Sequence, residues 1–539
     1  MFRASWQRLA TLGFLSALYI AGCGTGQHLV FAQEQAPVPR PVQAPEYPPP
    51  VPIAPPAPTP SDKPLPINLP SALQLAGVRP IDIGLASERI RLAAAQLARA
   101  QVLWLPTMYL GVDYFRHDGQ IQSVEGDVFG TSKQSFMFGA APYAVFAVTD
   151  AIFSPLAERQ TVRAREAALQ TARNDSLLVV AEAYFNVQQA RGELAGAVDA
   201  ARRAEEVVRR TEKLAAGGEG ILADVDVVRA RTEFDRRDQA VDTARERWRT
   251  ASAELARVLR LDPSALVEPL ETPHLRVTLV GLDKPVDDLI PVALTNRPEL
   301  AAQQALVQAT LVRLRQERLR PLIPSVLLRG ASTNPAGTLA GGDFGGGRNG
   351  ALGNFSARSD FDIQVLWEFQ NLGFGNAARV REQRSENQLT VLELFRVQDR
   401  VAKEVAEAYA QAQSAAARVV KAERGLKNAV ESAEKNFTGL GQTKTAGGTV
   451  PGSKVTVLVI RPQEVVAAVQ ALALAYGDYY GAVNDYNRAQ FRLYRALGQP
   501  AQLLAGQAPD CPGAPANCNP TPPPPSPSPA LLGAPRAVP

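Results

Sequence analysis

The residue types that most often carry out chemistry are sparse in this chain. Its three histidines, His28, His117 and His274, lie far apart in the sequence. Nucleophilic catalysis needs a base beside its nucleophile, and a zinc site needs several ligands together. Neither a catalytic triad nor a pair of metal ligands can be argued from such a set. We therefore expect no catalytic residue, no metal and no cofactor, and we do not expect an enzyme.

A glycine-rich stretch, "GGTVPGSK" at Gly447–Lys454, has some of the composition of a phosphate-binding loop. The order of its last residues is Gly-Ser-Lys, whereas that loop requires Gly-Lys-Ser or Gly-Lys-Thr between a strand and a helix. The stretch is therefore not predicted to bind a nucleotide.

The three cysteines all lie outside the candidate folded region, so no internal disulfide framework or zinc site is expected. Cys511 and Cys518 could form a disulfide in an oxidising compartment or remain a free pair. Cys23 follows Ile-Ala-Gly, an order that resembles the bacterial lipobox, in which cleavage leaves a lipid-modified cysteine first.

The amino terminus has the pattern of an export signal. Arg3 and Arg8 precede an apolar stretch at 9–20 and then small residues. The lipobox interpretation makes 1–22 the signal peptide and Cys23 the lipidation site. Ordinary cleavage after Ala32 is the alternative, with a signal peptide of 1–32.

Proline divides the rest of the chain. Of 43 prolines, 15 lie between Pro37 and Pro70, whereas 156–262 and 336–450 contain none. We interpret 23–68 as a proline-rich linker and 501–539 as a proline-rich disordered tail. The proline-free runs predict long helices in a folded body at 69–500.

That body contains an internal repeat. Arg79-Pro80 corresponds to Arg297-Pro298 and Pro106 to Pro324 at one offset, and "VAEAY" begins at both Val180 and Val405. The repeats are assigned to 69–270 and 271–500. Each is expected to run helix, strand, loop, strand, long helix, turn, long helix.

Heptad spacing of small apolar residues predicts coiled-coil packing of the long helices. In the first repeat the seam is interrupted by Arg191 and Glu205. The second repeat has an unbroken seam at Val401, Val405, Ala408, Ala412, Ala415, Val419, Ala422, Leu426, Ala429 and Ala433.

The segment "RSDFDIQVLWEF" alternates along its length. Phe361, Ile363 and Val365 share one face of a strand, and the opposite face is mostly acidic, with Asp360, Asp362 and Glu368. A half-buried sheet gives the same pattern. No other element offers a partner core, so we favour lipid on the apolar face and water on the acidic one. The segments 117–133 and 334–357 are interpreted as loops between strands.

Charge and strand number limit the possible partners. The 57 basic and 53 acidic residues form no basic block, so nucleic acid is not expected as a partner. Four strands per protomer cannot close a membrane barrel, because the smallest known barrels have eight. Three protomers would supply twelve strands.

The order of these features resembles the TolC-type outer-membrane efflux factors. The resemblance covers about 69–500 and is carried by "ALQLAGVRPID", "VALTNRPEL", both "AEAY" segments and the ending "YNRAQFRLYRALG". It implies a mainly α fold with a transmembrane β-barrel portion and long α-helical coiled-coil hairpins. Three chains would form a homotrimer with a twelve-stranded barrel in outer-membrane lipid and a twelve-helix tunnel in the periplasm.

The resemblance also implies a function. Such proteins are passive exit ducts of tripartite efflux or type I secretion systems, located in the outer membrane of a Gram-negative-type envelope. They dock to a periplasmic adaptor protein and to an inner-membrane pump or ABC exporter. The rival hypotheses are a periplasmic adaptor and a structural coiled coil that forms no pore.

By position, the resemblance places the turns between the long helices at the periplasmic tip. The second turn, 440–464, has 12 residues more than the first, 214–226. The candidates for adaptor docking are Leu214, Gly217, Gly218, Leu440 and Gly441, although glycines can also simply end helices. Asp224, Asp226 and Glu464 either line a tunnel constriction or stabilise the starts of the return helices.

Overall fold

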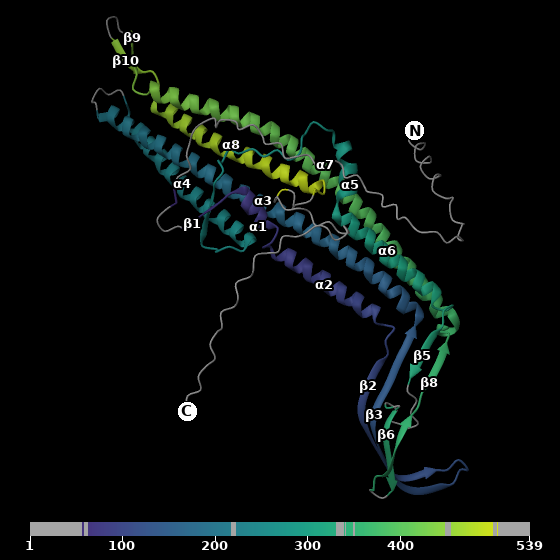
Figure 1. Ribbon diagram of the computed structural model, residues 1–539. Helices are drawn as coiled ribbons and strands as arrows, with labels where there is room; N and C mark the ends of the chain where they lie inside the picture. The colour runs from purple at the N-terminus through teal and green to yellow at the C-terminus, as the bar shows by residue number, and fades with distance from the viewer. Residues whose placement is uncertain are drawn as a thin grey trace, which may run out of the picture. The chain divides into compact units, whose positions relative to one another are not determined.

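The computed structural model describes residues 57–58, 63–216, 222–329, 339, 341–348, 351–447, 454–499 and 504. All of them belong to one compact unit, 41–539, which Figure 1 draws as a ribbon. The expected signal peptide, Cys23, Gly217, Gly218 and nearly all of the expected tail lie outside the described residues.

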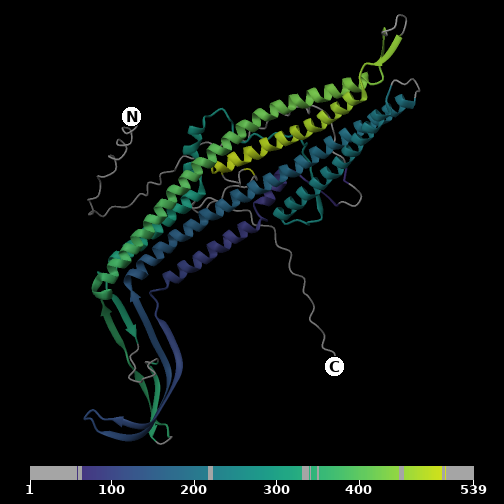
Figure 2. The ribbon, with the colours of Figure 1, turned by 180° about the vertical axis from the view of Figure 1, so that it is seen from behind.

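The first repeat is built around one very long helix. Helix α3 (Val148–Ala216) spans 69 residues, and α2 (Ile81–Gln101) and α4 (Asp224–Leu259) lie one after the other along it (Figures 1 and 2). The second repeat uses α7 (Phe374–Gly439), α6 (Pro298–Leu319) and α8 (Pro462–Ala496) in the same way. The helices of 271–500 thus follow the same order as those of 69–270, and the internal repeat stays a prediction.

The two repeats pack side by side as one layer of helices. Helix α3 contacts α6 and α8 and also α2 and α4, and Figures 1 and 2 show α2 and α4 on the side of α3 away from α6 and α7. Helix α4 also meets α8 over a short stretch, where Gln470 donates a hydrogen bond to Glu233. The order across the layer is thus α2 with α4, then α3, then α6 with α8, then α7. One edge of the layer is formed by α2 and α4, and the other by α7.

The heptad seam of the second repeat is buried as predicted. Val401, Val405 and Ala412 are at most 1% exposed in one apolar cluster, and the half-buried Ala422 and Ala429 pack against the next cluster along the helix. Small seam residues let α7 and α8 approach closely, because alanine adds little thickness between two helices. The burial of this row holds the α7–α8 pair together.

The first repeat departs from its expected seam at two positions. Arg191 is half-buried and donates hydrogen bonds to Glu268 and to the Pro269 carbonyl. Glu205 is exposed, and Ala204 and Val207 are buried in its place. The placement of Glu205 on the seam was wrong, because the 3.6-residue period of the helix carries the contact row one position back.

Helix α3 also begins earlier than expected. The proline-free run begins at Leu156, but α3 starts at Val148 and contains Pro155. A proline this close to the amino end removes one backbone hydrogen bond. The first turn is held by neighbouring residues, since Asp150 accepts hydrogen bonds of 2.7 Å from Gln316 of α6 and 2.6 Å from Arg320, the residue that follows α6.

A six-stranded antiparallel sheet follows the helical layer. Its strands are β2 (Thr107–Gln122), β3 (Val128–Ala147), β5 (Ser325–Arg329), β6 (Gly341–Arg348), β7 (Gly353–Ser359) and β8 (Asp362–Leu366). β5 and β6 pair with successive parts of β3, and β8 and β7 pair with β5 and β6 in turn. The expected four strand positions are present, with the second pair interrupted.

The interpretation of 117–133 and 334–357 as loops was wrong for much of their length. Strands β2 and β3 pair from Thr107 with Tyr143 out to Gln122 with Val128, which leaves 123–127 as the turn. In the second repeat 341–348 and 353–357 are strand. Glycine and polar residues are compatible with a strand whose faces meet solvent, so composition alone misplaced these boundaries.

A small lateral assembly packs on one side of the long helices. It consists of β1 (Lys63–Ile67), α1 (Leu69–Ala76), β4 (Ala265–Pro269) and α5 (Val286–Asn296). β1 pairs in parallel with β4, although its residues were expected to belong to the linker. Pro64 and Pro66 occupy alternate positions, and an edge strand tolerates proline where its N–H would point away from the partner.

The long turn of the second repeat contains a small ribbon. β9 (Thr443–Gly447) pairs with β10 (Lys454–Leu458) in antiparallel register between α7 and α8. Residues 443–447 and 454–458 of this turn therefore form a two-stranded ribbon. Within the described residues, none of the helices combines the length and apolar character of a membrane span.

Candidate functional site

The strand register places the apolar side chains on one face of the sheet. Val112 lies opposite Phe138, and Phe146 lies opposite Val326, which in turn lies opposite Val365. Side chains directly opposite in a ladder share a face. Val112, Phe138 and Val365 are 60%, 62% and 51% exposed. An apolar surface thus continues across all four strand positions without a covering element among the described residues.

The opposite face of the sheet carries the polar partners. Gln364 lies opposite Leu327 and donates a 2.8 Å hydrogen bond to Asp362. Asp360 accepts a hydrogen bond of 2.7 Å from Arg358, between β7 and β8. Glu368 follows β8 and accepts one of 2.5 Å from Gln370. The three predicted acidic residues therefore lie close together along one segment, but only Asp362 belongs to a strand.

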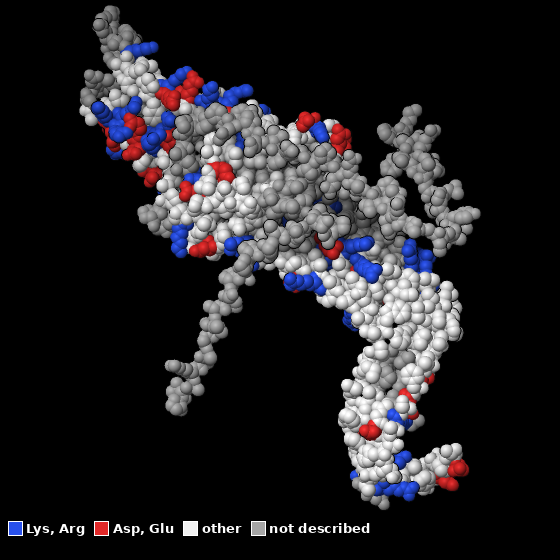
Figure 3. All heavy atoms as spheres, in the orientation of Figure 1, with Lys and Arg blue, Asp and Glu red and all other residues white. Residues whose placement is uncertain are grey.

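Charge is distributed unevenly over the molecule. Figure 3 shows few charged side chains over the part of the sheet nearest the long helices, and charged atoms toward the far turn of β2 and β3. On the helices, both signs are mixed. An uncharged belt beside charged ends is the distribution found on lipid-facing barrels.

One face of the helical layer is covered by the lateral assembly. Trp248 of α4 donates a 2.9 Å hydrogen bond to the Val267 carbonyl of β4. Gln188 of α3 donates to the Thr272 carbonyl at 2.7 Å, and Asn487 of α8 donates to the Leu275 carbonyl at 2.7 Å. Helix side chains on this face are therefore used to hold the lateral segments.

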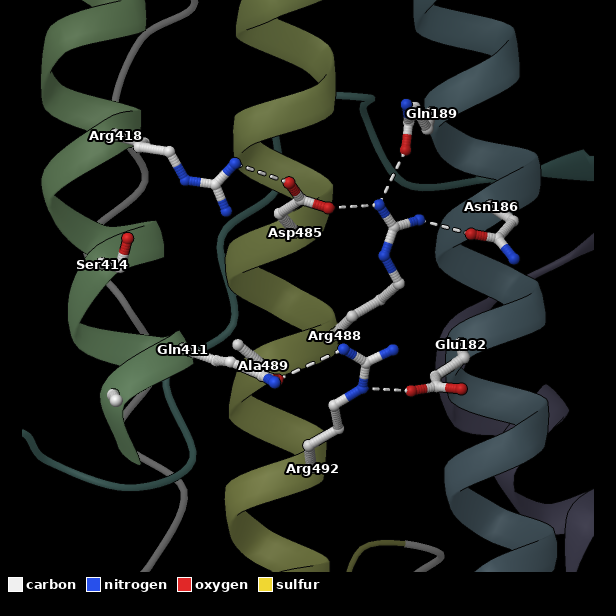
Figure 4. A pocket seen from close by; sticks show the side chains of 11 residues that line it. Glu182, Asn186, Gln189, Gln411, Ser414, Arg418, Asp485, Arg488, Ala489 and Arg492 are labelled. Carbon is white, nitrogen blue, oxygen red and sulfur yellow. Dashed lines mark hydrogen bonds and ion pairs between the residues drawn. The ribbon is translucent and has the colours of Figure 1, made fainter. Parts of the chain in front are cut away.

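The other face of the layer is hollowed and polar. A groove of about 820 Å³ runs between α3, α8 and α7, and Figure 4 shows it from close by. Helical periodicity puts Glu182, Asn186 and Gln189 of α3 on the side opposite Tyr184 and Gln188. The remaining polar lining comes from Gln411, Ser414 and Arg418 of α7 and from Asp485, Arg488 and Arg492 of α8.

Ion pairs cross the groove from α8 in both directions. Arg492 donates a hydrogen bond of 2.5 Å to Glu182 of α3. Asp485 accepts one of 2.6 Å from Arg488 of its own helix and one of 2.9 Å from Arg418 of α7. Figure 4 shows Arg418 reaching Asp485 from the α7 side, and the Arg492–Glu182 pair between α8 and α3. The arrangement presents charge along the bare face without burying it.

Toward the tip, a buried carboxylate joins the two repeats. Asp199 of α3 is 4% exposed and accepts hydrogen bonds from Tyr476 of α8 at 2.9 Å and from Arg203 at 2.8 Å. Burial alone would raise the pKa of Asp199, but the hydrogen bonds and charge of Arg203, with Tyr476, lower it overall. Burial and the same carboxylate raise the pKa of Tyr476. Asp199 is therefore a charged acceptor inside the layer.

The tip brings three of the predicted docking residues together. Leu440 is 8% exposed and belongs to the same apolar cluster as the half-buried Leu214. Gly441 has φ 90°, a left-handed conformation that favours glycine, and its Cβ position lies 3.6 Å from Leu214. These residues close the ends of the helices against one another, and Gly217 and Gly218 lie outside the described residues.

The tip carboxylates occupy the first turns of the return helices. Asp224 and Asp226 lie at the start of α4, and Glu464 lies at the start of α8. Asp226 also pairs with Arg229 at 3.2 Å. Carboxylates here stabilise a helix by facing the positive end of its dipole. Their positions fit the helix-start interpretation, and a tunnel-lining role stays a prediction.

No family model and no curated protein matches the sequence. Solved structures do match the fold. The outer-membrane channel OprN aligns with TM-score 0.63 at 17% identity, over 80% of this chain and 90% of that chain. The CmeC outer-membrane channel of Campylobacter jejuni aligns with TM-score 0.62 at 14% identity, over 80% of this chain and 85% of that one.

The outer membrane protein VceC of Vibrio cholerae aligns with TM-score 0.61 at 15% identity, over 80% of this chain and 96% of that chain. The chain has the fold of the TolC-type outer-membrane channels. The expected mainly helical fold class, with its long hairpins and sheet, is thereby confirmed.

The polar groove was missed by the sequence analysis. Asp485, Arg488 and Arg492 lie three, four and seven residues apart on α8 and so form one stripe, in a helix otherwise rich in tyrosine and alanine. That spacing was a usable signal. A charged stripe on a helix is usually a solvated face, so this stripe was not interpreted as the wall of a groove.

Proposed function

We propose that this protein is the passive outer-membrane exit duct of a tripartite efflux or type I secretion system. The observation that carries the proposal is that the two faces of the sheet differ from each other, and so do the two faces of the helical layer. The sheet has one continuous apolar face, and the helical layer has one covered face and one bare polar face. In the membrane, a channel wall needs an apolar face toward lipid and a polar face toward water. In the periplasm, the helical part of the wall needs one face toward the conduit and one face toward the outside.

The edges of the chain support assembly into a ring. β2 pairs only with β3, and β8 pairs only with β5, so each has a free outer edge within the described residues. Three protomers joined edge to edge would close twelve strand positions and twelve helix positions. A free strand edge of this length otherwise invites uncontrolled pairing. We therefore infer a homotrimer in outer-membrane lipid.

The edge helices carry apolar side chains that such a ring would cover. On α2, Ile81, Leu85 and Leu92 are 57%, 51% and 60% exposed. On α7, Leu389, Leu392 and Phe395 are 62%, 53% and 53% exposed. Two different apolar edges that cover each other make a head-to-tail contact, which is the type that generates rings.

The partners follow from the duct proposal. A passive duct uses no energy of its own, so we propose that a periplasmic adaptor and an inner-membrane pump or ABC exporter supply it. The adaptor would dock at the tip through Leu214, Gly217, Gly218, Leu440 and Gly441. We further propose that Asp360, Asp362 and Glu368 line the barrel, that Asp224, Asp226 and Glu464 face the tunnel entrance, and that Cys23 carries a lipid anchor.

The rival functions leave the six-stranded sheet without a role. A periplasmic adaptor or a coiled coil that forms no pore would use the helices, but neither needs a sheet with an exposed apolar face. The similarity of fold to outer-membrane channels also favours the duct.

The duct proposal is tested by membrane fractionation and planar-bilayer conductance of the full chain. We expect the protein in the outer-membrane fraction, purification as a trimer, and stepwise conductance from the purified oligomer. Recovery in the soluble periplasmic fraction, with no conductance in any oligomeric state, would overturn the proposal.

A further inference from the structure

The groove on the bare helical face has unequal numbers of opposite charges. Its lining contains three guanidinium groups, on Arg418, Arg488 and Arg492, and two carboxylates, on Glu182 and Asp485. Arg492 is paired with Glu182, which leaves the other two arginines to share Asp485. One positive charge per chain is therefore left over at the level of Asp485.

The surplus charge lies on the most accessible arginine of the groove. The side chain of Arg418 is 54% exposed, whereas that of Arg488 is 14% exposed and also donates to Asn186 and Gln189. Among the described residues Arg418 uses only Nη1, on Asp485. A guanidinium carries five N–H donors in a planar fork, so most of those of Arg418 remain available.

Neutral hydrogen-bonding groups stand beside Arg418 on the same helix face. Ser414 lies one turn before it and Gln411 two turns before it, and both are exposed in the groove. Figure 4 shows Ser414 below Arg418 on the α7 side of the groove. A volume of about 820 Å³ accommodates a drug-sized solute. Concavity, donors and one uncompensated charge are thus combined in one place.

A purely structural role, in which ion pairs join neighbouring helices, does not fully explain the charges of the groove. Arg492 with Glu182 and Arg488 with Asn186 already join α8 to α3 across the groove. The Arg418–Asp485 pair is solvent-exposed on both sides, and exposed pairs add little to stability. An ion pair that only joined α7 to α8 would also not require Asp485 to be shared between Arg418 and Arg488.

We propose that this groove binds the oxyanion group of a solute, a carboxylate, sulfonate or phosphate, with Arg418 as the contacting cation and Arg488 behind it. Guanidinium groups suit such ligands because their fork matches the geometry of an oxyanion. The inference deepens the duct function and rests on it, since exported solutes reach the groove only if the bare face lines the tunnel. Three copies around the tunnel would form a ring that favours anionic cargo.

The test uses the purified full-length oligomer and pyrene tetrasulfonate as a fluorescent polyanion, with binding followed by anisotropy. Arg418→Gln is expected to weaken binding at least about tenfold, because hydrogen bonds to charged groups are lost. Arg418→Lys, which keeps the charge, should retain part of the affinity. The matched control is Lys427→Gln, which removes the same charge nine residues along α7, on the opposite side of the helix. It should change binding less than about twofold.

A second readout separates the two proposals. In a bilayer with a salt gradient, Arg418→Gln should shift the reversal potential toward cation preference, and Lys427→Gln should leave it unchanged. Equal affinities and equal reversal potentials for wild type, Arg418→Gln and Lys427→Gln would overturn the anion site while leaving the duct intact. Absence of conductance with retained Arg418-dependent binding would overturn the duct and leave an anion-binding groove.

Discussion

Gly196 of α3 lies directly against Tyr476 of α8. A Cβ atom at Gly196 would stand 2.6 Å from the Cβ of Tyr476, and one at Gly192 would stand 2.5 Å from the ring of Tyr480. Tyr476 and Tyr480 are 1% and 6% exposed. The two repeats can approach this closely only because α3 has no side chain at either position. The contact between α3 and α8 therefore depends on two glycines one turn apart.

Gly196→Ala is expected to lower the free energy of unfolding by about 1–3 kcal/mol, because the added methyl group overpacks a contact with the root of a buried tyrosine. Urea or thermal unfolding of the purified protein measures the effect. The matched control is Gly425→Ala on α7, where the Cβ position has nothing within 4 Å. That change should stabilise the protein by about 0.4–1 kcal/mol. The contact is refuted if the two variants behave alike.

Asp199→Asn is expected to destabilise the protein near pH 7 by about 2 kcal/mol, since hydrogen bonds to a charged acceptor become neutral ones. The pKa of Asp199 in the folded state is lowered from its ordinary value of 3.8. A lowered pKa contributes stability that is present above the unfolded value and is lost as the pH falls through the folded one. The difference between wild type and variant should thus shrink below about pH 4. Urea unfolding at pH 7 and pH 3 checks this, and a difference independent of pH would argue against a charged Asp199.

The helices and the sheet faces could be predicted because each depends on local periodicity. The seam from Val401 to Ala433 repeats every 3.5 residues, and those residues are buried or half-buried in the α7–α8 contact. The alternation through Ile363 and Val365 fixed one strand face, and the ladder with Val326 carries that face across the sheet. Such patterns predict the fold because the side chains that pack together recur with the same period as the helix or the strand.

The groove and the bounds of several helices and strands depend on contacts between residues far apart in the sequence. No local sequence pattern predicts such contacts. Which face of α3 the lateral assembly covers is decided by Gln188 and Arg191 reaching residues about 80 positions away. Pro155 is tolerated in α3 because Asp150 is held from α6. The β9–β10 ribbon lies in a turn for which the sequence predicted only a greater length than the first turn. Each of these is a tertiary effect that overrides local propensity.

Val365→Arg is expected to block stable insertion of the protein into the outer membrane. An arginine on a lipid-facing strand costs up to about 2–4 kcal/mol, the most at the bilayer midplane. Gln364→Arg is the matched control, because the neighbouring residue of β8 lies on the opposite face. Quantification of the heat-stable oligomer in the membrane fraction measures both variants. Equal tolerance at the two positions would contradict the proposed orientation of the sheet.

Cys23→Ser is expected to abolish incorporation of a fatty-acid analogue into the protein. The expectation rests on the lipobox-like order Ile-Ala-Gly-Cys at 20–23. Click labelling of cells followed by purification measures incorporation, and Cys511→Ser serves as the control for a cysteine outside that motif. Unchanged labelling of the Cys23 variant would favour ordinary cleavage after Ala32.

The central claim is that the bare polar face of the helical layer lines a conduit. The most direct measurement is the conductance of a Ser414→Cys channel in a planar bilayer before and after a charged thiol reagent, with Cys511 and Cys518 replaced by serine. Lys427→Cys, on the opposite side of α7, is the control. We predict that the reagent reduces the conductance of the Ser414→Cys channel and leaves that of the Lys427→Cys channel unchanged. A reduction at Lys427→Cys with none at Ser414→Cys, or equal responses at both, would contradict the account.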